Sequence, residues 1–98
     1  MRTQYKPRLV FTSFRKERDV SENLHHYRLL LKSLEELKIG YIEAMGVYNN
    51  ELEQSIIIDD TELNRTLVKQ VCDFHNQECF LSIDNEGTGV LEYKNQIS

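Results

Sequence analysis

The sequence predicts an α+β fold, a two-layer sandwich in which an antiparallel sheet packs against two helices on one face. Three observations support this class. Two segments place apolar residues at helical spacing, five shorter segments are rich in β-branched and aromatic residues, and the order is β-α-β-β-α-β-β. That order matches the ferredoxin-like, or split βαβ, arrangement, in which right-handed crossovers place the first and third strands near the middle.

The first strand is expected over residues 8–14, where Arg8-Leu-Val-Phe-Thr-Ser-Phe14 is apolar on both faces. A helix is predicted over about 20–38. Asp19 and Glu22 have the spacing of an N-cap and its partner in the first turn, and Gly40 is placed to end the helix. Its apolar stripe comprises Val20, Leu24, Tyr27, Leu30, Leu31, Leu34 and Leu37.

A hairpin is predicted next, because two strand-like segments, 41–48 and 52–58, flank Asn49 and Asn50. A second helix follows over about 60–76. Asp59 and Glu62 repeat the capping spacing at its start. The remaining strands are expected at 79–83 and 90–93, joined by the turn residues 84–89.

Composition limits the class of protein. The chain has 98 residues, of which 40% are hydrophobic and 29% charged, and this fits one domain over 1–98 with a basic arm at 1–7 and a frayed tail at 94–98. No apolar run approaches the ~18–20 residues needed to cross a bilayer. Two cysteines are too few for a disulfide scaffold. We therefore expect a soluble, cytoplasmic protein with reduced thiols, no membrane partner and no cofactor.

The net charge of −4 is unevenly distributed. Residues 1–18 carry six basic residues and one acid, whereas residues 19–98 carry six basic residues and fifteen acids. The basic segment Arg15, Lys16 and Arg18 is a candidate surface for an acidic partner or for weak, non-specific nucleic-acid binding. The alternative is that these side chains solvate a loop and meet carboxylates of the same chain.

No motif in the sequence names a reaction, so no catalytic residue is predicted. Cys72, His75 and Cys79 do not have a zinc-finger spacing, and adjacent helical positions such as His25 and His26 diverge by about 100°, so no metal site is expected. Two hairpin acids, Glu43 and Glu53, are candidates for a carboxylate pair.

Polar residues interrupt the apolar face of both predicted helices. Asn23 lies in the apolar sector of the first helix, and Asn64 and His75 lie in that of the second. A buried amide must find hydrogen-bond partners. Two interpretations remain open: Asn23 and Asn64 bond to backbone in the first turns, or they mark a polar pocket at the sheet end.

Several short motifs resemble a family of small uncharacterised bacterial and phage proteins, known mainly as a domain of unknown function. The resemblance covers about residues 8–91, although the tryptophans of such relatives are missing here. It implies marked positions at Asn23, Glu53, Ser55 and Gln77, and it suits a phage accessory protein. The motifs are Ser21-Glu-Asn23, Arg28 with the leucines, Gly46-Val-Tyr48, Glu53-Gln-Ser55-Ile and Asn76-Gln77-Glu-Cys.

The main functional expectation is a small non-catalytic protein that binds another protein, as a phage accessory protein that modulates a host factor would, with its oligomeric state undetermined. The alternative is a domain that binds a small ligand or nucleotide, with catalysis possible, around Asn23, Arg28, Glu53 and Ser55, with Gln77 near them. Arg28 would hold a phosphate or carboxylate through its planar guanidinium. Nucleic-acid binding through the basic segment is the third hypothesis.

Overall fold

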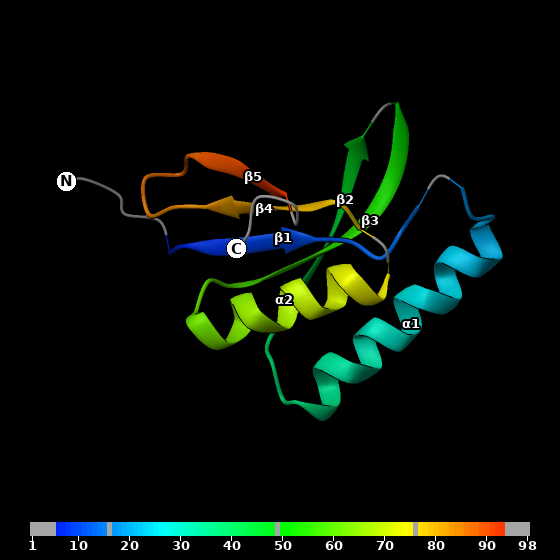
Figure 1. Ribbon diagram of the computed structural model, residues 1–98, viewed down its shortest axis with the longest axis horizontal. Helices are drawn as coiled ribbons and strands as arrows, with labels where there is room; N and C mark the ends of the chain where they lie inside the picture. The colour runs from blue at the N-terminus through cyan, green and yellow to red at the C-terminus, as the bar shows by residue number, and fades with distance from the viewer. Residues whose placement is uncertain (1–5, 16, 49, 76, 94–98) are drawn as a thin grey trace.

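The computed structural model describes residues 6–15, 17–48, 50–75 and 77–93. Five strands form one sheet in the order β2-β3-β1-β4-β5, and every neighbouring pair is antiparallel. Both helices lie on the same side of this sheet (Figure 1), so the predicted α+β sandwich is confirmed. The elements are β1 (Arg8–Phe11), α1 (Val20–Glu36), β2 (Ile42–Tyr48), β3 (Glu51–Asp59), α2 (Glu62–Phe74), β4 (Cys79–Ile83) and β5 (Gly89–Tyr93).

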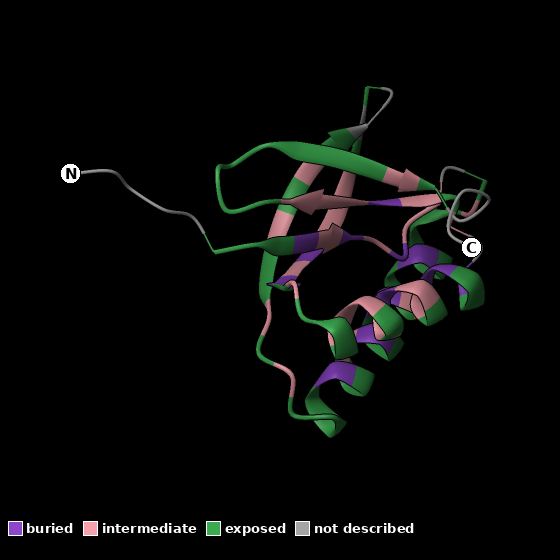
Figure 2. Ribbon diagram, turned by 60° about the vertical axis from the view of Figure 1, so that its left-hand side comes forward, coloured by how far each residue is buried: buried purple, intermediate pink, exposed green. Residues whose placement is uncertain are grey.

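The core lies between the helices and the sheet, where the buried residues gather in Figure 2. Alternation along the central strands produces this layer, since successive side chains of a strand point to opposite faces. Ile56 and Ile58 are buried beneath the helices, which turns Ser55 and Ile57 to the other face of the sheet. The other buried hydrophobic residues are Leu9, Phe11, Tyr27, Leu30, Leu34, Val68, Cys72 and Phe80.

The first helix begins as predicted and ends differently. Asp19 is the N-cap, and its carboxylate accepts a hydrogen bond of 2.8 Å from the Glu22 amide. At the other end Lys38, not Gly40, takes the left-handed conformation, with φ 58°. The amide of Ile39 bonds to the Leu34 carbonyl at 2.9 Å, which completes a Schellman motif. The prediction that Gly40 ends the helix was therefore wrong, because the motif places its left-handed residue two positions earlier.

The second helix is capped by Thr61 and not by Asp59. The Thr61 hydroxyl accepts from the Asn64 amide at 3.1 Å, whereas Asp59 still belongs to β3 and pairs with Arg8 of β1. The Asn64 side chain donates to the Asp59 carbonyl at 3.0 Å. Asn64 therefore bonds to backbone in the first turn, as one of the two interpretations predicted.

Two hairpins complete the sheet. Between β2 and β3, Asn50 has φ 64°, a conformation that asparagine tolerates well. Between β4 and β5, the Asp84 carboxylate accepts from the amides of Glu86 and Thr88, each at 2.9 Å, and Gly87 has φ 85°. Asn49 and most of the expected arm and tail lie outside the described residues.

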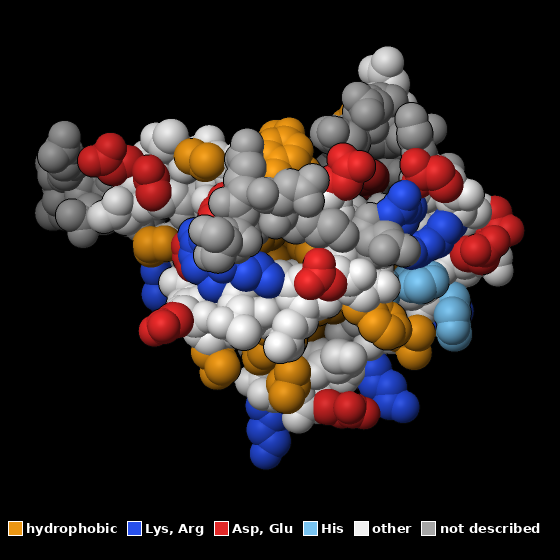
Figure 3. Space-filling model, in the orientation of Figure 1, with side chains coloured by type: hydrophobic (Ala, Val, Ile, Leu, Met, Phe, Trp, Pro, Cys, Tyr) orange, Lys and Arg blue, Asp and Glu red, His pale blue; other side chains and the backbone are white. Residues whose placement is uncertain are grey.

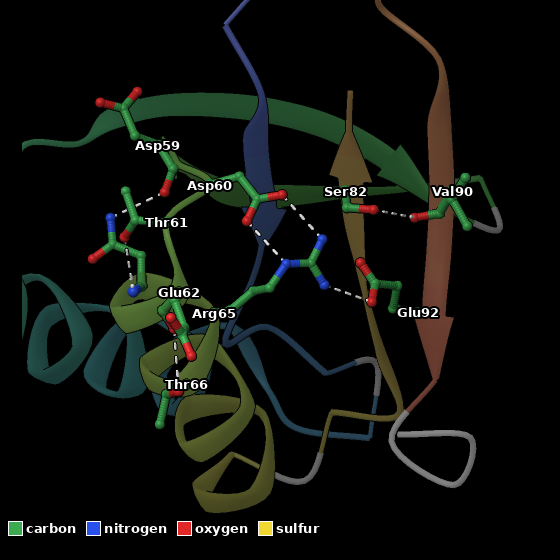
Figure 4. Close-up of polar contacts among 10 residues, drawn as sticks. Asp59, Asp60, Thr61, Glu62, Arg65, Thr66, Ser82, Val90 and Glu92 are labelled. Atoms are coloured by element: carbon green, nitrogen blue, oxygen red, sulfur yellow. Dashed lines mark hydrogen bonds and ion pairs between the residues drawn. The ribbon is translucent and has the colours of Figure 1, made fainter. Parts of the chain in front are cut away.

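An arginine clamp fastens α2 to β5 (Figure 4). The Arg65 guanidinium binds both carboxylate oxygens of Asp60, at 2.9 and 3.0 Å, and reaches Glu92 Oε1 at 2.7 Å. This hydrogen bond holds the pKa of Glu92 below its ordinary value. The clamp is a local structural tie, since all three charged groups are used within the chain.

Neither helix in the described part of the chain is long and apolar enough to cross a membrane.

Candidate functional site

The segment between β1 and α1, which we call the β1–α1 loop (residues 12–19), is held by side chains from several elements. The Thr12 hydroxyl donates to the Gln54 carbonyl at 2.7 Å and accepts from the Phe14 amide at 3.0 Å. Arg18 donates to the carbonyls of Ser13 and His75, both at 3.0 Å. The loop is therefore tied to β3 at one end and to the end of α2 at the other.

Asn23 and Gln77 brace the same loop from two directions. The Asn23 side chain accepts from the Arg15 amide and donates to the Arg15 carbonyl, each at 2.9 Å. Gln77 Nε2 donates to the Phe14 carbonyl at 2.7 Å. Both amides thus satisfy backbone groups, which is the backbone-bonding interpretation of Asn23. The structure brings these two predicted site residues to one loop.

The loop presents an aromatic ring to a buried tyrosine. The rings of Phe14 and Tyr27 meet edge to face, with centroids 6.0 Å apart. The Tyr27 hydroxyl donates to Glu43 Oε1 at 2.6 Å, across from α1 to β2. Burial, and then the hydrogen bond to Glu43, raise the pKa of Tyr27 well above its ordinary value, so the phenol remains a proton donor. The side chain of Gln54 lies within hydrogen-bonding reach of the same hydroxyl.

We call Phe14, Tyr27, Glu43 and Gln54 the phenol–carboxylate site. Tyr27 is buried and Glu43 is exposed, so the pair runs from the core to the surface. A carboxylate oriented by a phenol suits a cationic ligand, because its charge attracts the cation. The sequence interpretation missed this site because Tyr27 fits the apolar stripe of α1. The hydroxyl of Tyr27 could have indicated the site from the sequence, since the hydroxyl of a buried tyrosine usually has a polar hydrogen-bond partner.

The other predicted residues lie elsewhere. Glu53 pairs with Gly46 and Ser55 with Ala44, on the face of the sheet that points away from the helices. Burial, together with the negative charges of Glu78 and Glu53, raises the pKa of the Cys79 thiol. Arg28 is exposed on α1. The structure does not gather Asn23, Glu53 and Ser55 into one site within the chain.

Register also separates the two hairpin acids. Glu43 is opposite Ile56, whose side chain is buried beneath the helices, while Glu53 is an odd number of residues from Ile56 along β3. Because side chains alternate along a strand, Glu43 and Glu53 point to opposite faces. The predicted pairing of Glu43 with Glu53 was therefore wrong. Glu43 instead pairs with Tyr27, whose hydroxyl donates to its carboxylate.

The basic segment is largely occupied within the chain. Arg15 forms an ion pair with Glu17 at 3.2 Å, and Arg18 bonds to two carbonyls. Lys16 lies outside the described residues. Among the described residues, no three histidine, cysteine or acidic side chains are grouped to hold a metal ion.

The fold and the site define a small α+β protein in which a surface carboxylate is held by a buried tyrosine. The chain matches the model of the S-adenosylmethionine lyase family over residues 9–97. It therefore belongs to this family. No curated protein sequence gives a significant match.

The family assignment corrects the main functional expectation. A non-catalytic protein that modulates a partner does not fit a family of lyases, so that interpretation was wrong. The alternative, a small-ligand domain with catalytic activity, fits the family better. The match also covers all but the first residue of the 8–91 range of the expected resemblance and assigns it to a family with a named activity.

Proposed function

We propose that this protein is a lyase that cleaves S-adenosylmethionine. The observation that carries the proposal is the family match, which spans residues 9–97 and so includes all helices and strands of the fold except the first residue of β1. The charge distribution supports it, because residues 19–98 carry fifteen acids against six basic residues. An acidic surface raises the local concentration of a cationic substrate.

The reaction breaks one carbon–sulfur bond of the sulfonium without adding water. The bonding electron pair stays on sulfur, which becomes a neutral thioether. The carbon fragment balances its charge by losing a proton or by closing a ring. The protein must therefore bind a cation, orient it for departure of the thioether and exclude water from the reacting carbon.

The phenol–carboxylate site is the part of the described structure that fits this task best. Glu43 supplies the charge that pairs with the sulfonium or with the substrate ammonium group. Tyr27 fixes the position of that carboxylate through its 2.6 Å hydrogen bond. The site positions the substrate and matches its positive charge with a carboxylate. It does not have to activate the leaving group, because the sulfonium is already activated in the substrate.

The test is turnover of S-adenosylmethionine by the purified chain, with the thioether product measured by chromatography and mass spectrometry. We expect Glu43→Gln to lower kcat/KM about 100-fold, which corresponds to about 2.7 kcal/mol. Tyr27→Phe should lower it about tenfold, because the carboxylate is kept while its orientation is lost. Absence of any thioether from the wild-type protein would refute the proposed function.

The matched control is Glu35→Gln. Glu35, an exposed residue in the last turn of α1, also accepts a hydrogen bond from a tyrosine, the half-buried Tyr41, at 3.1 Å. Its removal should leave kcat/KM within about twofold of wild type, as surface substitutions usually do. Glu53→Gln tests the other face of the sheet. A large loss there, with Glu43→Gln unaffected, would move the site to Glu53 and Ser55.

A further inference from the structure

Two histidines outside the phenol–carboxylate site face each other where α1 meets the end of α2. His26 Nδ1 and His75 Nδ1 are 2.9 Å apart, and their rings meet near the perpendicular with centroids 5.0 Å apart. His75 is only 3% exposed, and His26 is half-buried. Figure 3 shows histidine at the surface next to basic side chains.

A hydrogen bond between two Nδ1 atoms requires that one ring donate and the other accept. A neutral imidazole carries its hydrogen on only one nitrogen, so one of these rings has the Nδ1–H tautomer and the other keeps a lone pair on Nδ1. One added proton can be held as a charge-assisted hydrogen bond. Two added protons leave two N–H groups facing each other at 2.9 Å, and the hydrogen bond cannot exist.

We propose that His26 and His75 form an acid-sensitive latch that fastens α1 and the β1–α1 loop to the end of α2 while the pair holds at most one added proton, and releases them when both rings are protonated. This imidazole latch is a conformational device additional to the proposed lyase site, and its tests do not depend on activity.

The groups around the latch oppose its protonation. Burial lowers the pKa of His75 to about 4, with His26 and Arg18 adding repulsion. Burial also lowers the pKa of His26, with repulsion from Arg18 of the loop and His25 of α1, while Glu22 acts in the opposite direction. From α2, the Phe74 ring packs on His75 with centroids 4.9 Å apart and offers no charge.

Arg18 connects the latch to the loop. Its guanidinium bonds to the carbonyls of His75 and Ser13, so the end of α2 and the exit of β1 are held by one side chain. A charged imidazole pair beside Arg18 gathers three cations in a partly buried space. Separation of α1 from α2 relieves this repulsion. The β1–α1 loop, whose Phe14 packs against Tyr27, is then no longer held to the end of α2.

The primary test uses nitrogen-15 NMR of the wild-type histidine rings. At pH 7.5 we expect one of the two rings to show the Nδ1–H tautomer. Both rings should titrate below the pH at which the same residues titrate in the urea-unfolded chain. Two Nε2–H tautomers, or titration at the unfolded pH, would overturn the latch.

The second test measures hydrogen exchange of the Phe14 and Arg15 amides, corrected for the intrinsic pH effect. Between pH 7 and a pH below about 4, the value to which the pKa of His75 is lowered, their protection should fall at least tenfold more than that of the Leu30 amide in the middle of α1. The double variant His26→Phe/His75→Phe keeps the ring packing and should lose this pH dependence, whereas His25→Phe should retain it. Equal pH dependence in the double variant and the wild type would contradict the proposal.

Discussion

Replacing Arg65 by methionine should destabilise the protein by about 2–3 kcal/mol, because it removes the clamp between α2 and β5. The guanidinium makes two hydrogen bonds to Asp60 and one to Glu92. An exposed ion pair contributes about 0–1 kcal/mol, and a hydrogen bond to a charged group about 1.5–3 kcal/mol. The three side chains are 32%, 16% and 24% exposed, so the expected loss lies between a surface pair and a buried one.

The assay is thermal unfolding followed by circular dichroism at pH 7. A loss of this size should lower Tm by roughly 10–15 °C in a domain of this length. Arg65→Lys should lose about half as much, since an ammonium group cannot bind both oxygens of Asp60 in parallel. Lys32→Met, an exposed lysine on α1, controls for a general charge effect.

The pH dependence gives a second check on the clamp. The hydrogen bond from Arg65 lowers the pKa of Glu92, so its contribution is complete above pH 4.5, the ordinary value, and is lost as the pH falls through the lowered value. The stability difference between wild type and Arg65→Met should therefore shrink below about pH 4.5. A Tm for Arg65→Met equal to that of Lys32→Met, or a difference that grows in acid, would refute the reasoning.

Four further outcomes are expected in unfolding experiments. Lys38→Gly should stabilise the protein by about 0.5–1 kcal/mol, because glycine adopts the left-handed conformation without strain. Ser13→Ala should be neutral or stabilising by up to about 1 kcal/mol, since this buried hydroxyl has no hydrogen-bond partner among the described residues. Asn23→Ala should cost about 0.5–2 kcal/mol through the loss of its bonds to Arg15. The free energy of unfolding should fall as the pH drops from 6.5 to about 4, because in this range His75 binds a proton in the unfolded chain but remains neutral in the folded protein.

Most of the fold could be predicted because local patterns and tertiary packing agree. The apolar stripe of α1, the Asp19 cap and the alternation of the central strands each point to the same sandwich. The helix ends were less predictable. Lys38 occupies a conformation that glycine favours, and only the two hydrogen bonds of the Schellman motif reveal this. Thr61 displaced Asp59 as a cap because Asp59 stays in the β3 ladder, which a spacing pattern cannot show.

The candidate site depended on information that a single strand or helix does not contain. Glu43 and Glu53 are both hairpin acids, and only the register against Ile56 shows that they face opposite ways. Tyr27 was counted as core, which is correct for its ring and incomplete for its hydroxyl. Asn23 and Gln77 were predicted to bind a ligand or partner; the structure shows that they support the β1–α1 loop, and their part in binding stays a prediction.

The absence of a recognisable catalytic motif led the sequence interpretation away from an enzyme, and the proposed reaction explains why that inference failed. Motifs mark reactions in which the protein must create a nucleophile, hold a metal ion or cradle phosphates. In a sulfonium the leaving group is already activated, since departure of the thioether neutralises a positive charge. A protein that cleaves such a substrate needs a carboxylate in a fixed position and a surface that attracts the cation. We propose that Tyr27 and Glu43, which are distant in sequence and joined by a hydrogen bond, meet the first need, and that the acids of residues 19–98 meet the second.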